Sequence, residues 1–517
     1  MHKIKNDIFA GITAAVVALP LALAFGVASG AGAIAGLYGA IILGFFAAFL
    51  GGTPTQISGP TGPMTVVVAA TVTTFPNDLC TVMAVIFFAG LMQISFGIIG
   101  IGKWIKYIPY PVISGFMCGI GIIIIILQIN PFLGVEGFGS IIQTLSSLPN
   151  TLQKVNYEAL MVATITLIIM FLTPKKISKL VPSALIALVL VSYFSFAMDF
   201  KINTIGEIPM GLPDFALPLS FDLLKLNTIL MLAITLAFLA SIDSLLTSLV
   251  ADSMTKTKHN PKKELIGQGI GNTVCSFFGA IPGAGATMRT VININSGATT
   301  KLSGMTHSIT LLIIVLFLAP LASKIPLAVL SGILIKVGFD ILDYRFLKIL
   351  NKITKQDLLI MLTVFLLTIF VDLIMAVGVG ITISSILAVY QVSKTTQIKI
   401  TRSKVSFDIE IIKINGSLFF GTASHLDEKL GKIRDTKRVI LDCKNVSFLD
   451  ISAIFTLEEI IEKFRTKGLE IILVLKYRHK RKILTLDTAN LFKNIKIYHS
   501  LDDAINYAQK HGITTNE

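Results

Sequence analysis

The strongest constraint on the fold is a series of long apolar segments along the first 400 residues. A helix needs roughly 20 apolar residues to cross a bilayer, or fewer where it is broken and shielded by protein. On this basis we predict fourteen spans, of which the third and tenth are too short to cross alone. They are 8–28, 33–50, 62–76, 79–100, 108–130, 157–173, 180–198, 227–250, 264–280, 286–296, 304–320, 326–341, 357–372 and 375–394. The sequence therefore predicts an all-α polytopic membrane domain.

Composition agrees with a protein embedded in a lipid bilayer. Hydrophobic residues make up 53% of the chain and charged residues 14%, which is too little charge to cover a soluble surface. The net charge of +14 does not indicate nucleic-acid binding, because the basic residues are scattered through short loops without interleaved aromatics. The four cysteines show no CxxC spacing and are expected to be reduced; they are Cys80, Cys118, Cys275 and Cys443.

The positions of the basic residues orient the predicted spans. If the N-terminus is cytoplasmic, most lysines and arginines of the membrane domain fall in even-numbered gaps. The odd-numbered gaps carry only Lys154, Lys201, Lys225 and Lys324. The positive-inside rule then places both termini in the cytoplasm of a multi-pass protein of the plasma (inner) membrane.

Two motifs in the membrane domain occur twice and in the same order. "IPYPVISG" at 108–115 matches "IPLAVLSG" at 325–332, and "GPMTVV" at 62–67 aligns with "TMRTVI" at 287–292. The matches predict two halves of seven spans each. An odd number of spans inverts the second half, which gives the 7+7 inverted repeat of secondary transporters. In such proteins the substrate site lies near the midplane, where two broken helices meet.

Both halves contain a glycine- and proline-rich stretch before a short span. These stretches are "GGTPTQISGPTGPMTVVVAA" at 51–70 and "GAIPGAGATMRTVININSG" at 279–297. A helix that begins inside the membrane offers free N–H groups and a positive dipole end, which bind an anion without a charged side chain. The alternative is that these residues are kinks that allow close helix packing.

The candidate substrate-binding residues lie at the starts of the two half-helices. The first half-helix begins near Pro63, after Thr61 and Gly62, and the second begins near Ala286. Arg289 is the only cation inside the second half-helix. It either adds positive potential to the anion path or extends its side chain to the cytoplasmic surface.

Asp243 is an isolated carboxylate within the eighth predicted span, where a buried charge requires a reason. Thr247 lies one helical turn further on the same face, so a carboxylate and a hydroxyl are placed together. Oxygen ligands of this kind suit sodium, and protonation of Asp243 is an alternative. A third possibility is a carboxylate that only packs against neighbouring hydroxyls.

Catalytic and nucleotide-binding motifs are missing from the sequence. The seven histidines are dispersed, and neither an HExxH motif nor a GxxxxGK[ST] loop occurs. The chain is therefore expected to be no enzyme, to need no cofactor other than a coupling ion, and to be driven by an ion gradient.

The sequence changes character near residue 400. Strand-like β-branched runs alternate there with charged amphipathic helices, which predicts a small α/β domain. The predicted boundaries are 1–397 for the transmembrane anion transporter domain and 398–517 for the cytoplasmic domain. We expect an internal strand in "RVILDC" and helices after Gly421 and after Asp450.

These features together resemble the SulP (sulfate permease) transporters with a C-terminal STAS domain. The resemblance rests on "DIFAGITAAVVALPLALAFGVASGAGAIAGLYGAI", "GGTPTQISGPTGPMTVVV", "YPVISGFMCGIGIII", "HNPKKELIGQGIGN" and "VILDCKNVSFLDISAIFTLEEI". The chain is most similar to the branch with sodium-dependent bicarbonate transporters, through "ASGAGA", "PTGPMTVV", "VADSMTKTKHNPKKELIGQG" and "GAGATM". The resemblance implies core and gate subdomains, elevator-type movement and a homodimer to which the STAS domain contributes.

The resemblance also implies specific site residues. The sodium site would consist of Asp243, Thr247, Gly285 and Thr287, and the anion site of Thr61, Ala286 and Thr287.

Two positions depart from the bicarbonate branch. Gly59 stands where that branch can carry an acidic residue, and Arg289 matches the wider sulfate-permease pattern. An arginine beside the site favours more highly charged anions.

The expected function is import of a small inorganic anion, bicarbonate first and sulfate second, coupled to sodium or protons. Two alternatives stay open. One is a nucleobase or C4-dicarboxylate transporter of the same architecture. The other is a membrane-anchored signalling protein in which the loop around Ser452, which resembles the phosphorylatable loop of anti-sigma-factor antagonists, is the output. In a transporter we expect Ser452 to cap a helix instead.

Overall fold

The structure is a computed structural model. It describes residues 2–103, 107–138, 140–174, 177, 181–206, 215–218, 222–371, 373–402, 408–422, 436–487 and 490–510. The chain forms two compact units, Met1–Ile381 and Thr382–Glu517. The division falls inside one long helix near the end of the predicted membrane domain.

The first unit is helical, and a helix overlaps each of the fourteen predicted spans. The helices are α1 (His2–Ala28), α2 (Ala33–Leu50), α3 (Gly62–Thr74), α4 (Leu79–Ile99), α5 (Tyr110–Leu127), α6 (Ile129–Phe132), α7 (Ile141–Gln153), α8 (Tyr157–Leu172), α10 (Ser183–Ala197), α11 (Leu226–Thr255), α12 (Pro261–Ser276), α13 (Thr287–Asn295), α14 (Lys301–Ala322), α15 (Leu327–Ile341), α16 (Tyr344–Leu347), α17 (Lys355–Phe370) and α18 (Leu373–Thr395), which continues into the second unit.

Six of the described helices are long and apolar enough to cross a membrane: α1, α2, α4, α5, α11 and α18. A seventh span results if α7 and α8, which meet at a bend of 120°, are counted as one. Helix α7 was not predicted. Its sequence, IIQTLSSLPNTLQ, places apolar residues three or four apart (Ile141, Ile142, Leu145, Leu148 and Leu152), the pattern of an amphipathic helix, so it lacks the continuous apolar run by which the spans were predicted.

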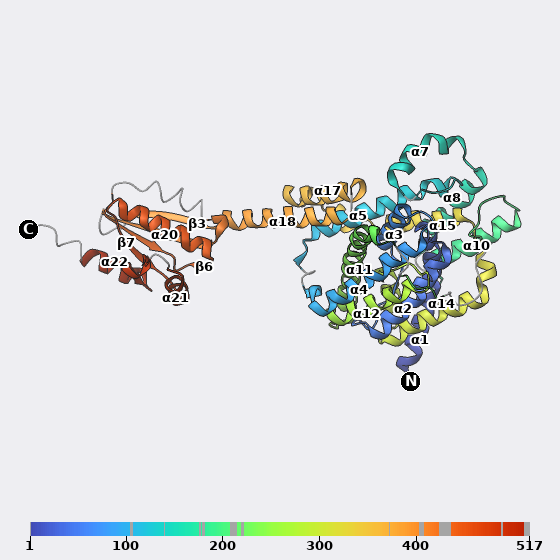
Figure 1. Cartoon of the computed structure of the whole chain (residues 1–517), viewed down its shortest axis with the longest axis horizontal. Helices are drawn as coiled ribbons and strands as arrows, with labels where there is room; N and C mark the ends of the chain where they lie inside the picture. The colour runs from blue at the N-terminus through green and yellow to red at the C-terminus, as the bar shows by residue number, and fades with distance from the viewer. Residues whose placement is uncertain are drawn as a thin grey trace, which may run out of the picture. The chain divides into compact units, whose positions relative to one another are not determined.

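Helices from the two halves of the sequence interleave in this unit. Figure 1 shows the blue N-terminal helices among the green and yellow ones, and α12 packs against both α4 and α2. Paired glycines bring α4 and α12 together. A Cβ on Gly90 would lie 2.8 Å from the carbonyl oxygen of Gly269, and a Cβ on Gly269 would lie 2.7 Å from that of Gly90. Such small-residue contacts are how helices approach closely in a bilayer.

The second unit contains a sheet flanked by helices, as predicted for a small α/β domain. The strand order is β3-β4-β5-β7-β8, and β6 also pairs with β4. Its strands and helices are β3 (Gln397–Arg402), β4 (Ile409–Leu418), β5 (Arg438–Asp442), β6 (Val446–Leu449), β7 (Glu470–Val474), β8 (Lys496–Tyr498), α20 (Ile451–Thr466), α21 (Tyr477–Leu486) and α22 (Leu501–Lys510). Strand β5 is internal, as its sequence predicted. The helix expected after Gly421 falls largely outside the described residues.

Alternation along β5 explains how both faces of this sheet are covered. Val439 and Leu441 belong to the apolar cluster with α20, whereas Ile440 packs on the other side with Ala504 and Ala508 of α22. Successive strand side chains point to opposite faces, so an apolar run such as VIL requires a helix on each side.

The prediction that Ser452 caps a helix is wrong, because Asp450 holds that position. The Asp450 carboxylate accepts hydrogen bonds from the backbone N–H groups of Ala453 (2.7 Å) and Phe420 (3.0 Å). Ser452 lies in the first turn of α20 and is exposed. Aspartate and serine are both good N-caps, and the residue at which the helix starts decides between them.

Asp450→Ala is expected to destabilise the start of α20 by about 1 kcal/mol, the usual cost of losing an N-cap. Hydrogen exchange of the full-length protein should show faster exchange in the first turns of α20. Ser452→Ala is the matched control and should leave that exchange unchanged. Equal effects of both variants would contradict the assignment of the cap.

Candidate substrate-binding site

Two very short strands bring the two glycine-rich stretches together. Strand β1 (Ser58–Gly59) pairs antiparallel with β2 (Ala284–Gly285). Helix α3 begins three residues after β1, and α13 begins two residues after β2. The pairing therefore places the N-termini of the two half-helices next to each other, as the sequence predicted. It also requires a glycine at position 283, where a Cβ would lie 2.1 Å from the carbonyl oxygen of Gly59.

The two half-helix N-termini open into a cavity of about 240 Å³. Seven of the eight site residues predicted from the sequence line it: Thr61, Gly62, Asp243, Gly285, Ala286, Thr287 and Arg289. Apolar side chains of α1, α5 and α15 form much of the remaining wall, including Val17, Leu21, Phe25, Met117, Val337 and Ile341. No sequence signal distinguished these wall residues, because they resemble the ordinary apolar residues of a membrane span.

Three buried polar atoms that line this cavity make no hydrogen bond of good geometry within the protein, although the Thr61 hydroxyl and the Asp243 carboxylate are close enough to interact with each other. They are the Thr61 hydroxyl oxygen, one carboxylate oxygen of Asp243 and Nη1 of Arg289. Leaving a buried polar atom unpaired costs free energy, so their convergence indicates that the cavity accommodates a polar ligand. A hydroxyl and a guanidinium can donate to an anion, and the carboxylate can accept a proton or bind a cation.

Arg289 does not extend to the cytoplasmic surface, so that alternative is wrong. Its side chain is 2% exposed, and Nη2 donates to the carbonyl oxygen of Pro60. Asp243 and Arg289 interact electrostatically but do not form an ion pair. The guanidinium therefore contributes positive potential to the cavity without being neutralised by direct contact.

The two departures from the bicarbonate pattern are neighbours in space. A Cβ at Gly59 would lie 2.7 Å from Nη1 of Arg289. An acidic side chain at position 59 would therefore meet the guanidinium, whereas glycine leaves Nη1 free on that side. The two positions together set the charge at this end of the cavity.

Thr247 is the predicted site residue that does not line the cavity. It is fully buried, its hydroxyl donates to the carbonyl oxygen of Gly285 (2.9 Å), and it lies 2.7 Å from the hydroxyl of Thr287. Asp243 lies one turn away on the same helix. The four proposed sodium ligands thus lie around the start of α13 and offer only oxygen atoms, which is the donor set that a hard cation prefers.

Glu264 is a buried residue that sequence reasoning did not single out. One carboxylate oxygen accepts from the backbone N–H groups of Gly52 and Thr53, both at 2.8 Å. The other accepts from the side-chain amides of Gln56 (2.8 Å) and Gln268 (2.9 Å). The carboxylate thereby ties the irregular approach to β1 onto α12. The sequence signal was a lone acidic residue in "PKKELIGQG" at the start of a predicted span.

Glu264→Gln is expected to loosen residues 51–59, because four donors converge on the carboxylate and an amide offers only one acceptor oxygen, so one pair of donors would face its NH2 group. Each unsatisfied buried donor costs about 1–3 kcal/mol. Hydrogen exchange across 51–59 should accelerate and anion uptake should fall. The neighbouring change Lys263→Gln, at an exposed side chain, serves as the control. Unchanged exchange in Glu264→Gln would show that the carboxylate does not hold this segment.

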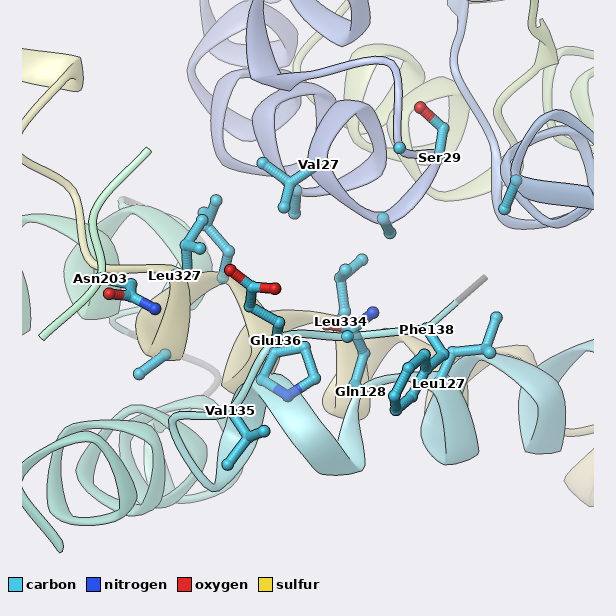
Figure 2. Close-up of a pocket in the computed structure, with 18 of the residues that line it drawn as sticks. Val27, Ser29, Leu127, Gln128, Val135, Glu136, Phe138, Asn203, Leu327 and Leu334 are labelled. Atoms are coloured by element: carbon cyan, nitrogen blue, oxygen red, sulfur yellow. The ribbon is translucent and has the colours of Figure 1, made fainter. Parts of the chain in front are cut away.

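A second cavity, of about 370 Å³, lies further along the same helices. Figure 2 shows the side chains of Glu136, Gln128 and Asn203 around the space below Val27. Helices α1, α3, α5 and α15 contribute to both cavities. The side chains of Ile124 and Ile341 pack closely against Gly62, where a Cβ would lie 2.8 Å from Ile124 and 2.9 Å from Ile341.

Comparison with known proteins identifies both parts of the chain. Residues 4–364 match the model of the sulfate permease family, and residues 402–504 match that of the STAS domain. The bicarbonate transporter BicA of Synechocystis sp. is 44% identical over 500 residues, covering 92% of this chain and 88% of that protein. The putative sulfate transporter YvdB of Bacillus subtilis is 32% identical over 519 residues, covering 97% of each chain.

Solved structures show the same architecture. The transmembrane domain of a cyanobacterial bicarbonate transporter BicA matches with a TM-score of 0.68 at 49% identity, covering 73% of this chain and 98% of that one. The structure of SLC26A9 matches with a TM-score of 0.84 at 19% identity, over 99% and 91% of the two chains, and supports the fold alone. The resemblance predicted from the sequence motifs is confirmed. The chain belongs to the sulfate permease family, as an anion transporter with a C-terminal STAS domain and not an enzyme.

Proposed function

We propose that the protein is a secondary active importer of a small inorganic anion, bicarbonate or sulfate, coupled to sodium or protons through Asp243. The observation that carries this proposal is the convergence, in one cavity between two helix N-termini, of three buried polar atoms that lack a well-formed hydrogen bond within the protein. The atoms belong to Thr61, Asp243 and Arg289.

The anion would lie between the starts of α3 and α13. Its donors are the first-turn N–H groups of both helices, except at Pro63, which has none, together with the Thr61 hydroxyl and Nη1 of Arg289. Thr61 and Ala286 are the N-cap residues of the two helices, and neither makes a side-chain capping bond. These N–H groups therefore remain available to a ligand that carries negative charge.

The coupling cation would bind at Asp243. A bare carboxylate beside the cavity repels an anion, so sodium or a proton at Asp243 removes that repulsion before the anion enters. Each ligand thus favours binding of the other, and this reciprocal coupling makes the cycle a symport. Sodium would draw its remaining oxygen ligands from Thr247, Gly285 and Thr287.

The proposed architecture has fourteen spans in a 7+7 inverted repeat, divided into core and gate subdomains with elevator-type movement. It is supported by the helix found at each predicted span and by the pairing of equivalent strands from the two halves. We further propose that both termini lie in the cytoplasm and that the protein is a homodimer to whose interface the STAS domain contributes.

The cavity volume supports a second candidate substrate class. A volume of about 240 Å³ is many times the ~10–15 Å³ of cavity space that one water requires. This leaves room for a hydrated oxyanion, and equally for a C4-dicarboxylate whose apolar middle faces the walls from α1 and α15. Binding of such an organic anion uses the same donors.

Uptake into proteoliposomes distinguishes these substrates. Labelled bicarbonate, sulfate and succinate are each supplied with and without a sodium gradient, at fixed pH. We expect concentrative uptake of one inorganic anion that depends on the cation gradient. Succinate uptake alone would establish the dicarboxylate alternative, and absence of flux for every anion would contradict a transport function.

A further inference from the structure

Helix α21 in the STAS domain carries an unusual density of positive charge. Five of the seven residues in KYRHKRK are cationic: Lys476, Arg478, Lys480, Arg481 and Lys482. Lys480 is half-buried and the other four are exposed. None of the five forms an ion pair within the described part of the chain, so their charge is not neutralised by the domain itself.

Large apolar side chains surround these cations. Phe448 is 54% exposed, Ile451 52%, Phe455 45% and Tyr477 77%. Phe448 lies beside the cations, because Lys482 donates to the carbonyl oxygen of Leu449 at 2.6 Å and its ammonium lies 6.0 Å from the centre of the Phe448 ring. Tyr477 is the first residue of α21, and Ile451 and Phe455 lie in the first two turns of α20, which begins two residues after Leu449. We call these nine residues, the five cations and the four apolar side chains, the α21 surface.

The charge of the α21 surface does not depend on histidine. His479 is 3% exposed, and burial together with the neighbouring Arg478 lowers its pKa below the ordinary value. The imidazole therefore stays neutral at neutral pH. The positive charge comes from lysine and arginine side chains, which remain protonated across the physiological range.

The short link between the STAS domain and the last predicted span favours lipid as the binding partner of the α21 surface. Helix α18 ends at Thr395 and β3 begins at Gln397, so one residue joins the STAS domain to the final predicted span. A domain on so short a tether stays within reach of the bilayer surface. Clusters of basic residues next to a membrane helix bind anionic lipid, and aromatic side chains settle at the headgroup level.

We propose that the α21 surface docks on anionic phospholipid headgroups of the leaflet to which the STAS domain is tethered. The cations pair with headgroup phosphates, while Phe448, Ile451, Phe455 and Tyr477 enter the interface. An acidic protein or a nucleic acid would meet the same charges, but neither is held nearby by the chain. The proposal uses the membrane anchorage of the family and not the identity of the transported anion.

The first test uses full-length protein in nanodiscs of phosphatidylcholine, with or without phosphatidylglycerol. Hydrogen exchange of 476–486 and 446–455 is expected to slow by about fivefold or more in the anionic discs, since each cation near such a surface strengthens binding by about fivefold. The protection should disappear in 1 M salt, where the screening length falls to about 3 Å.

Paired charge reversals supply the control. Arg478→Glu/Arg481→Glu should remove the lipid-dependent protection, whereas Lys399→Glu/Lys413→Glu, on the paired strands β3 and β4, should retain it. Exchange of β5 reports whether the domain remains folded. Equal exchange in both kinds of disc, or loss of protection in both variants, would overturn the proposal.

A second measurement reports direct contact with lipid. The chain has a single tryptophan, so Trp104→Phe/Tyr477→Trp places the only tryptophan fluorescence on the α21 surface. Acyl-chain-brominated phosphatidylglycerol should quench this fluorescence, and the quenching should be lost when Arg478→Glu/Arg481→Glu is added. Lipid-independent protection without quenching would show that protein covers α21, and would refute docking on lipid.

Discussion

Asp243→Asn is expected to lower anion uptake strongly and to remove its coupling to the cation gradient, while the transporter remains folded. The substitution keeps the shape of the side chain but removes the charge that sodium or a proton would neutralise. Loss of a hydrogen-bonding or ligating charge costs about 1.5–3 kcal/mol, so uptake should fall on the order of 10- to 100-fold and lose its dependence on the gradient. Initial rates in proteoliposomes with and without the cation gradient measure both effects.

The control for Asp243→Asn is Asp222→Asn, at an exposed residue that precedes α11. It removes one carboxylate without touching the cavity and should transport like the unchanged protein. Size-exclusion chromatography and thermal unfolding establish that both variants are folded. Unchanged uptake with unchanged cation dependence in Asp243→Asn would refute the assignment of the cation site.

Arg289→Met is expected to raise the KM for the anion by roughly 10- to 100-fold, because it removes the buried donor Nη1 and its charge. The effect should be larger for sulfate than for bicarbonate, since the Coulomb energy scales with the charge of the ligand. Methionine preserves much of the side-chain length, so the cavity wall is retained. Concentration dependence of uptake for both anions measures the change.

Two further variants separate charge from geometry at this position. Arg289→Lys keeps the charge and loses the planar fork, so it should recover part of the affinity. Arg345→Met, on the short helix α16, is the control for loss of a cation elsewhere in the transporter domain. A KM that is equal in Arg289→Met and the unchanged protein would exclude a contact between the guanidinium and the substrate.

Hydropathy made the helices of the first unit predictable because an apolar run of sufficient length has few other structures open to it. Helix α7 was not predicted because it is amphipathic, with apolar residues three or four apart and no continuous apolar run. The two-residue strands β1 and β2 could not be found either, since a pair of residues has no periodicity. The two strands lie more than 220 positions apart in the sequence, and only the folded arrangement of the two halves brings them together.

In the candidate site, too, some residues could be predicted from the sequence and others could not. Thr61, Ala286 and Asp243 could be selected because breaks and lone charges in a membrane span are costly and therefore conspicuous. Glu264 carries the same kind of charge, but its function depends on backbone N–H groups about 210 residues away. The two interpretations of Arg289 were equal in the sequence, and its burial against Pro60 decides between them.

The hydrogen-bonded pairing of β1 with β2 makes the spacing of the two half-helices independent of the charge and size of the cavity. Because it consists of main-chain groups, the spacing between the two half-helices is fixed by the distance of about 4.8 Å between neighbouring strands and not by side chains. Substitutions at cavity-lining positions can then alter charge and size while the two helix ends keep their separation. Under the proposed assignment of this cavity to the anion, a few point changes in its lining would exchange one transported anion for another without altering the main-chain pairing that holds the two helix ends.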